Sequence, residues 1–251
     1  MKTAPDTAPA WDAGTLADPH RRDDKAARVE AMFDAIAPTY EKVNRVATFG
    51  QDAAWRRRAI AATGVQSHEV ALDLCCGTGD MVRAFDAHAT PPRLIIGLDF
   101  SAQMLASGSY PQMRRPFQLV RSDALRLPLA DASVDVITCA FGVRNFQDLD
   151  RGLREMQRVL RPGGRVVILE FAMPENWLFR VGYQVYTSYV LPALGTLIAR
   201  DRSGAYKYLP RSIETFDTRK SMCDRLGRAG FEKMTCPTMN FGSVVIYRAE
   251  K

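Results

Sequence analysis

Several patterns that mark common classes of protein are missing from this chain of 251 residues. It has no G-x-x-x-x-G-K-[ST] stretch, so a P-loop that cradles nucleotide phosphates is not expected. Its five cysteines include no C-x-x-C pair, so they predict neither a disulfide framework nor a zinc site. We interpret them as small buried side chains in a reducing cytoplasm, and we expect no metal site.

Long apolar runs and long basic runs are missing as well. The start of the chain lacks the apolar core of a signal peptide, which favours the cytoplasm. The most apolar stretch, residues 175–200, is interrupted by Arg180 and Pro192, so it does not predict a membrane span. The net charge is +6, but no run of Lys and Arg exceeds the three of residues 56–58. A nucleic-acid patch is therefore not indicated, and the charge leaves open a solvated surface or attraction to an anionic membrane.

The composition is that of an ordinary globular protein, with 47% hydrophobic and 25% charged residues. The length suffices for one α/β domain with a full core. Residues 1–22 are rich in Ala, Pro, Thr and Asp and show no apolar period, which predicts a disordered tail. We expect residues 23–251 to form a single domain.

Strands and helices alternate along most of this domain, which predicts a Rossmann-like α/β fold. One helix begins at residue 23 and ends near Pro38, a loop holds residues 40–44, and a second helix covers 52–62. A helical insertion is expected over about 175–215, where the alternation is interrupted. The predicted strands are residues 70–74, 93–99, 117–120, 133–140 and 165–171, with two more around Met234 and 244–247.

Residues 70–80 read as a buried strand that ends in a glycine-containing turn and then opens a helix. Gly77 and Gly79 allow the backbone to approach a ligand, because they have no Cβ. The third glycine of the dinucleotide fingerprint is replaced by Val82, so that fingerprint is incomplete. With Asp73 four residues before the first of these glycines, the stretch resembles motif I of the class I S-adenosylmethionine-dependent methyltransferases. A strand–turn–helix without a ligand is the alternative.

Further acids follow the next two predicted strands. Asp99 ends the second strand, where a carboxylate can accept hydrogen bonds from two ribose hydroxyls. Met104, in the helix that follows, is assigned to the same site. Asp123 and Ala124 follow the third strand, where the Asp can accept the exocyclic amine of an adenine. A simple loop cap is the alternative for Asp123.

The residues after the fourth strand, Ala140 to Phe146, read Ala-Phe-Gly-Val-Arg-Asn-Phe. In this architecture they lie at the edge that holds the transferred methyl group. Arg144 and Asn145 are well placed there to orient a polar substituent of a ring. The alternative is a surface ion pair between Arg144 and a nearby acid, Asp148 or Glu155.

Several stretches together resemble the methyltransferases that C-methylate the ring in menaquinone and ubiquinone biosynthesis. They are residues 137–145, 153–156, 158–165, 169–171, 33–40 with Asn44, 206–209 with 212–213, and 229–231. The resemblance extends from about residue 27 to 251. It implies a seven-stranded, mostly parallel sheet with helices on both faces and an antiparallel C-terminal strand. It also implies S-adenosylmethionine as cofactor and a prenylated quinol as substrate.

The resemblance also assigns individual positions. It implies cofactor contacts at Thr78, at Asp99 and at the pair Asp123 and Ala124, and Ala140 stands where the family has a serine contact. Other departures leave the identity of the substrate open. They are Asp52 in place of a histidine three residues before Trp55, Glu41 in place of an aspartate, and Tyr247 in place of a histidine.

The implied reaction is methyl transfer to a ring carbon of the quinol. The sulfonium is already a good leaving group, so the protein mainly supplies in-line proximity. The ring carbon becomes nucleophilic as a neighbouring hydroxyl loses its proton, and the candidates to receive or relay this proton are Arg144, Asn145, Tyr40, Tyr206 and a water that they hold. Because arginine keeps its proton, we expect Arg144 to stabilise the phenolate.

Two other functions stay open: methylation of another phenolic or polyketide molecule, and a non-catalytic S-adenosylmethionine-binding scaffold in a quinone-synthesis complex. Methylation of nucleic acid is not indicated, because no N/D-P-P-Y/F follows the fourth strand and no Pro-Cys occurs. The apolar insertion can hold the prenyl chain or rest on the inner face of the membrane, and core packing is the alternative. Whether the chain acts in the cytoplasm alone, as a homodimer or in a complex is left open.

Overall fold

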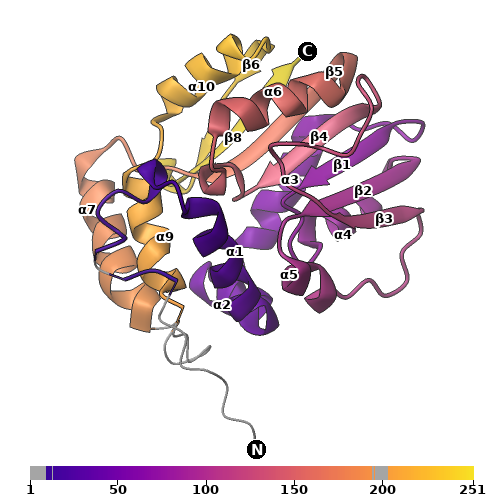
Figure 1. The fold of residues 1–251 in the computed structure, drawn as a ribbon. Coiled ribbons are helices and arrows are strands. Elements are labelled where there is room, and N and C mark those ends of the chain that lie inside the picture. Colours follow the sequence, from indigo (N-terminus) through magenta and orange to yellow (C-terminus); the bar gives the residue numbers. More distant parts are fainter. Residues whose placement is uncertain (1–9, 13, 194, 196–202) are drawn as a thin grey trace, which may run out of the picture.

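The alternating strands build one eight-stranded sheet in the order β3-β2-β1-β4-β5-β8-β6, with β7 paired to β8 (Figure 1). The computed structural model describes residues 10–12, 14–193, 195 and 203–251. The strands from β3 to β5 are parallel, and β8 runs antiparallel to β5. This confirms the predicted fold class, and the two-residue β7 is the strand beyond the seven expected. The strand bounds are β1 Val70–Leu74, β2 Leu94–Asp99, β3 Phe117–Arg121, β4 Val134–Ala140, β5 Leu160–Phe171, β6 Glu232–Thr235, β7 Thr238–Met239 and β8 Val244–Glu250.

Helices cover both faces of the sheet. The α-helices are α1 Lys25–Ile36, α2 Tyr40–Ala47, α3 Asp52–Thr63, α4 Asp80–Asp86, α5 Ala102–Ser107, α6 Leu149–Val159, α7 Trp177–Val185, α9 Ala205–Glu214 and α10 Arg219–Arg228. Shorter helical turns are η1 Pro19–Arg21, η2 Ala37–Thr39, η3 Val143–Asn145 and η5 Asn240–Gly242, and η4 Tyr186–Val190 is a π-helix. The predicted loop over residues 40–44 is wrong. The chain passes Pro38 in η2 and then forms α2.

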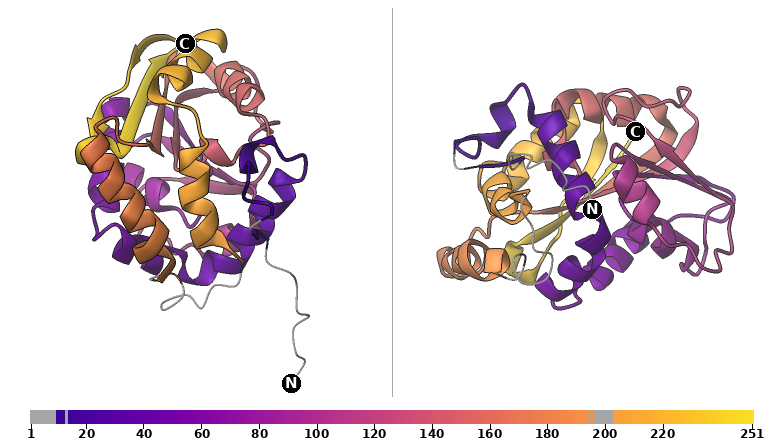
Figure 2. Two further views of the ribbon diagram at one scale, coloured as in Figure 1. Left: turned by 90° about the vertical axis from the view of Figure 1, so that its left-hand side faces the viewer. Right: turned by 60° about the horizontal axis from the view of Figure 1, so that its bottom comes forward.

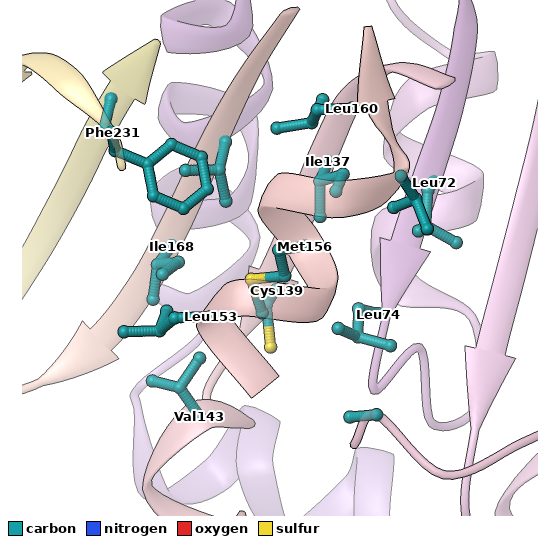
Figure 3. Packing of buried hydrophobic residues seen from close by; sticks show 14 of the residues in the cluster. Leu72, Leu74, Ile137, Cys139, Val143, Leu153, Met156, Leu160, Ile168 and Phe231 are labelled. Atoms are coloured by element: carbon teal, nitrogen blue, oxygen red, sulfur yellow. The ribbon is translucent and has the colours of Figure 1, made fainter. Parts of the chain in front are cut away.

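Successive residues of the central strands point to opposite faces, so each face has its own core. On one face α6 packs over the central strands, as Figure 3 shows for Leu153 and Met156 beside Ile137 and Ile168, and α10 packs over β8 and β6. On the other face α3 and α4 pack over the alternate strand residues. Every residue of β1 is therefore buried, as expected for a central parallel strand covered on both sides.

A third apolar cluster lies outside the sheet. It joins the N-terminal segment, α1, α2 and α9, which Figures 1 and 2 show grouped at one end of the molecule. Trp11 is only 1% exposed, stacks on Tyr208 at 4.4 Å and donates its backbone N–H to the carbonyl of Ser203. The described part of the predicted tail thus packs onto the domain, because one aromatic side chain anchors a segment that has no apolar period. Residues 1–9 and 13 lie outside the described part.

The predicted insertion forms α7, η4 and α9, with residues 194 and 196–202 outside the described part. None of the nine residues of α7, all of them described, is buried. Figure 2 shows α7 and α9 side by side on the outer side of the molecule. Among the described residues, no helix is both long enough and apolar enough to span a bilayer.

Candidate active site

The turn after β1 has a backbone that glycine alone adopts easily. Gly77 and Gly79 have φ values of +55° and +89°. A Cβ on Gly79 would lie 2.3 Å from the Tyr110 ring, and one on Gly77 would lie 3.0 Å from Met104 Cε. The turn is fixed to the end of β2, because Gly77 donates its N–H to Asp99 Oδ2 at 2.8 Å.

A first cavity, which we call the turn cavity, opens beside this turn and has a volume of about 100 Å³. Six of the nine predicted cofactor residues line it: Gly77, Asp99, Met104, Asp123, Ala124 and Ala140. They come from the carboxyl ends of four strands and from the helix after β2. Parallel strands present these ends at one edge of the sheet, which explains why separate sequence signals meet here.

Asp99 is the most constrained of these groups. Its Oδ2 accepts from Gly77 N–H and its Oδ1 accepts from Ser101 N–H, both at 2.8 Å. Each oxygen keeps a lone pair for a further donor, which suits a pair of ribose hydroxyls. Burial raises the pKa of Asp99 against the lowering effect of these backbone bonds.

The other three predicted cofactor residues do not line the turn cavity. Asp73 is fully buried, and Thr138 Oγ1 donates to its Oδ1 at 2.8 Å. Its Oδ2 has no hydrogen-bond partner among the described residues, and burial raises its pKa to about 8. Gly79 shapes the turn, and Thr78 faces a separate shallow pocket that Lys42 and Ser107 also line.

A second cavity, which we call the apolar cavity, has a volume of about 250 Å³. Its wall comes mainly from α1, α2, α3, α9 and η4, and most of its surface is apolar. Of the four predicted catalytic residues, Tyr40, Arg144 and Tyr206 line this cavity, whereas Asn145 lines the turn cavity. Tyr40 and Phe141, with Phe33, line both cavities, so the two spaces adjoin at these side chains.

Arg144 is buried and not on the surface. It is 5% exposed, and its Nη1 pairs with Glu170 Oε1 at 2.5 Å and donates to the Phe141 carbonyl at 3.0 Å. The alternative pairing with Asp148 or Glu155 is therefore wrong. Asp148 caps α6, and Glu155 binds Arg158. The Glu170 carboxylate raises the pKa of Arg144 against the opposing effect of burial, so the guanidinium keeps its charge.

Asn145 and Tyr40 have restricted chemistry. Asn145 Oδ1 accepts from the Tyr208 hydroxyl at 2.9 Å, and its Nδ2 donates to the Phe141 carbonyl at 3.3 Å. Burial raises the pKa of Tyr40, so this phenol stays protonated at neutral pH and can donate a hydrogen bond at the junction of the two cavities. Asn145 thus acts as a fixed part of the wall.

Sequence analysis did not assign three charged residues to the site: Glu170, Asp52 and Arg56. Arg56 is 6% exposed, pairs with Asp52 and, at 3.0 Å, with Asp80, and lies 5.9 Å from the centre of the Phe141 ring. The i, i+4 spacing of Asp52 and Arg56 on one helix was the available signal. Within the described ranges, no cluster of three or more His, Cys, Asp or Glu side chains could hold a metal ion.

These features together suit a nucleoside-bearing cofactor next to an apolar ring. The glycine turn leaves space that a Cβ would fill, and half-buried Asp99 offers free lone pairs towards the turn cavity. Asp123, which follows β3, lines the same cavity, with its Oδ1 accepting from Leu125 N–H. The residues present therefore fit S-adenosylmethionine.

Comparison with known proteins gives matches along nearly the whole chain. The model of the ubiE/COQ5 methyltransferase family matches residues 21–251. A demethylmenaquinone methyltransferase of Deinococcus radiodurans is 42% identical over 212 residues, which cover 84% of this chain and 87% of the relative. The demethylmenaquinone methyltransferase of Bacteroides fragilis is 37% identical, with 90% and 94% covered. A ubiquinone/menaquinone biosynthesis C-methyltransferase of Geobacter sulfurreducens is 38% identical, with 92% and 91% covered.

Solved structures support the fold at lower identity. A SAM-dependent methyltransferase of Thermotoga maritima has a TM-score of 0.62 and 18% identity, with 88% of this chain and 99% of that chain covered. One from Mesorhizobium loti has a TM-score of 0.59 and 19% identity, with 80% and 100% covered. The family model and the relatives lead to one conclusion: the chain belongs to the ubiE/COQ5 methyltransferase family and is an S-adenosylmethionine-dependent methyltransferase.

Proposed function

We propose that this enzyme transfers a methyl group from S-adenosylmethionine to a ring carbon of a prenylated quinol in the formation of menaquinone or ubiquinone. The observation that carries the proposal is the junction of the turn cavity and the apolar cavity at Tyr40 and Phe141. A cofactor held by Asp99 and Asp123 would occupy the turn cavity, which adjoins the apolar cavity at this junction. The names of the relatives point to the same class of acceptor.

The wall of the apolar cavity suits a quinol ring. Phe141 stacks on Phe171 at 4.4 Å, and Trp55 meets both rings edge-on at 6.3 and 6.2 Å. All three rings line the apolar cavity and give it an aromatic wall against which a ring can pack. Trp55 is itself fixed by a 2.8 Å hydrogen bond from its Nε1 to Asn240 Oδ1.

The reaction requires negative charge to develop on the quinol ring. When bound, S-adenosylmethionine supplies an electrophilic methyl group on a sulfonium. A quinol carbon attacks it readily only after a hydroxyl of the ring has given up its proton. Arg144 places a permanent positive charge in the cavity wall and is held there by Glu170, so it stabilises the phenolate without having to reorganise. Arg144, Tyr40 and Tyr206 are our candidates for contact with the ring hydroxyls.

The prenyl chain can leave the cavity along η4, whose Tyr186 and Thr187 line it. Next to this wall lies an apolar patch of exposed side chains on α7, η4 and two neighbouring turns. Its members are Trp177, Leu178, Phe179, Val181, Val185, Tyr189, Val190, Phe49 and Phe241. Phe179 stacks on Phe241 at 4.4 Å, which joins α7 to η5 in this patch.

We propose that the apolar patch rests on the surface of the inner face of the membrane, from which the prenylated substrate is taken. Exposed basic side chains stand on the same segments of the chain: Arg180 lies between Phe179 and Val181 on α7, and Arg45 precedes Phe49 by four residues. Apolar side chains flanked by cations suit a leaflet that contains anionic lipids. A second copy of the chain is the competing occupant of the patch.

The activity is tested by expressing the chain in strains that lack the naphthoquinol or the benzoquinol methylation step and identifying their quinones by mass spectrometry. Restored methylation in either strain is the expected result, and it also identifies the acceptor. Purified enzyme is then given reduced quinols alongside unrelated phenols and polyketides. Methylation of those phenols with no methylation of any quinol would overturn the proposal, as would tight cofactor binding without transfer.

The membrane contact is tested by sedimentation with phosphatidylcholine vesicles with and without phosphatidylglycerol. We expect Trp177→Ser/Leu178→Ser/Tyr189→Ser to lose binding to the anionic vesicles and to turn over a long-chain quinol poorly, while a short-chain soluble analogue reacts normally. Val120→Ser/Met234→Ser, which removes exposed apolar groups elsewhere, is the matched control. A triple variant that still binds vesicles but changes from dimer to monomer would instead assign the patch to a second copy.

A further inference from the structure

The apolar cavity contains a carboxylate, that of Asp52, which has no role yet in the proposed methyl transfer. Asp52, the first residue of α3, is the one acid among the described residues that line this cavity. No histidine or cysteine of the described ranges lines it. The other ionisable side chains of its wall are tyrosines and arginines, which keep their protons at neutral pH.

Asp52 is held firmly and close to the junction of the two cavities. Thr48 Oγ1 donates to its Oδ1 at 3.0 Å, and Arg56 binds its Oδ2. Arg56 in turn lies 5.9 Å from the centre of the Phe141 ring, which lines both cavities. The Asp52 side chain is 13% exposed, so a proton that it receives can pass to water later. Asp52 therefore flanks the aromatic surface proposed to hold the ring.

Methylation at a ring carbon requires the loss of two protons: first that of a ring hydroxyl, and then that of the methylated carbon. The ring electron pair forms the new C–C bond, and the S–CH₃ bond breaks with its electron pair moving to sulfur. The attacked carbon is then tetrahedral and carries both the new methyl group and its original hydrogen. Aromaticity returns only when this C–H bond breaks, with its electron pair moving back into the ring and its proton moving to a base. No oxidant or further reactant is needed.

We propose that Asp52 is the base that accepts this ring proton, in an inference that rests on the proposed methylation of a quinol ring. Loss of the proton restores an aromatic ring, so a weak base is sufficient for this step. This matters because Arg56 and Thr48 lower the pKa of Asp52 against the effect of its burial. Arg144, which lines the same cavity, acts on the phenolate oxygen, so the two residues serve different atoms of the same ring.

The test uses a quinol that carries deuterium at the carbon to be methylated. We expect Asp52→Asn, which keeps the shape of the side chain, to lower kcat by about 10²-fold or more. We expect its affinity for S-adenosylmethionine, measured by calorimetry, to stay within a few-fold of wild type. We also expect the rate ratio between the protonated and deuterated quinol to rise from close to unity in wild type to a normal primary isotope effect in the variant.

A second carboxylate that pairs with Arg56, that of Asp80, provides the matched comparison. Asp80→Asn also removes one partner of Arg56 but leaves Asp52 in place, so it should not produce an isotope effect. If Asp52→Asn leaves kcat unchanged, or lowers it without an isotope effect as Asp80→Asn would, Asp52 only positions Arg56 and the inference is overturned. Should Asp52→Asn fail to bind the cofactor, the rate of Asp52→Ala is measured with added formate. A rise with formate concentration supports the inference, and no response overturns it.

The two proposals fail in different ways. Absence of quinol methylation by the wild-type enzyme would defeat the proposed function, and the isotope measurement would then have no reaction to report. Normal quinol methylation by wild type, together with full activity of Asp52→Asn, would defeat this inference alone.

Discussion

At the scale of single residues, backbone conformation limits what the cofactor turn can tolerate. Gly77→Ala places a side chain at φ +55°, which costs about 1 kcal/mol of stability, and sets a methyl group against Met104 in the turn cavity. We expect the affinity for S-adenosylmethionine, measured by calorimetry, to fall by on the order of tenfold, or about 1.4 kcal/mol.

The control for this change is Gly163→Ala. Its φ is +76°, and a Cβ there would meet no atom within 4 Å, so it reproduces the backbone strain without obstructing the cavity. A similar loss of cofactor affinity in both variants would show that the turn responds to global stability and not to lost space.

The Arg144–Glu170 pair requires stability and catalysis to be measured separately. Arg144→Ala leaves Glu170, which is 0% exposed, without its cation, and breaking such a buried pair costs about 3–5 kcal/mol. Replacing both members by Met removes both charges and is expected to recover most of this loss. We expect neither variant to methylate a quinol, since both lack the guanidinium that stabilises the phenolate.

Urea unfolding and a methyl-transfer assay on the same samples check this prediction. Glu170→Gln is a useful third variant, because it keeps Arg144 while removing the opposing charge. Normal turnover by the doubly substituted enzyme would show that Arg144 has a structural role only.

At the scale of elements, sequence reasoning worked where signals are local. The strand ends that line the turn cavity could be predicted because an acid or a polar pair follows each apolar run, and a parallel sheet brings these ends together. What it missed are pairs made in three dimensions. Arg144 meets Glu170 across two strands, and Trp11 stacks on Tyr208 almost two hundred residues later in the chain. Neither contact produces a repeating pattern of residues that the sequence alone would reveal.

The docking of the N-terminal segment is expected to depend on pH through His20. His20 Nε2 donates to the Ser212 carbonyl at 2.8 Å, and Lys25 Nζ, which also binds the carbonyls of Arg144 and Phe146, donates to its Nδ1 at 3.2 Å. Burial and the nearby charge of Lys25 lower the pKa of His20 to about 4. The charge of Arg144 contributes to this lowering, whereas the hydrogen bond to the Ser212 carbonyl and the charge of Asp18 oppose it.

Because this folded-state pKa lies below the ordinary value of 6.5, the unfolded chain takes up the proton first as the pH falls. The stabilising contribution of neutral His20 is therefore complete above pH 6.5 and is lost progressively towards pH 4. We expect the free energy of unfolding to fall less steeply in His20→Gln than in wild type over this window. His68→Gln, at an exposed position, is the control and should follow wild type. Parallel curves for all three proteins would contradict the prediction.

At the scale of the whole molecule, both cavities lie at one end of the sheet and α1, α2, α9 and η4 close over them. Helices on the two faces of the sheet leave that end open, and the N-terminal helices and the insertion fill it. The apolar patch meets the wall of the apolar cavity at Phe49, which belongs to both. Cofactor, ring and prenyl chain can thus follow one path from the sheet to the outer surface.

This arrangement predicts that residues 23–251 and the packed N-terminal segment unfold as one unit. The three tryptophans report on different parts: Trp11 on the N-terminal segment, Trp55 on α3, and Trp177 on α7. We expect Trp11→Phe/Trp177→Phe and Trp55→Phe/Trp177→Phe each to give a fluorescence transition in urea that coincides with its own circular dichroism transition. Saturating S-adenosylmethionine at about 100 times its Kd should stabilise both by about 2.7 kcal/mol. A transition of Trp11 at lower urea that ignores the cofactor would instead show that the N-terminal segment opens on its own, leaving the wall beside Tyr208 incomplete while the sheet stays folded.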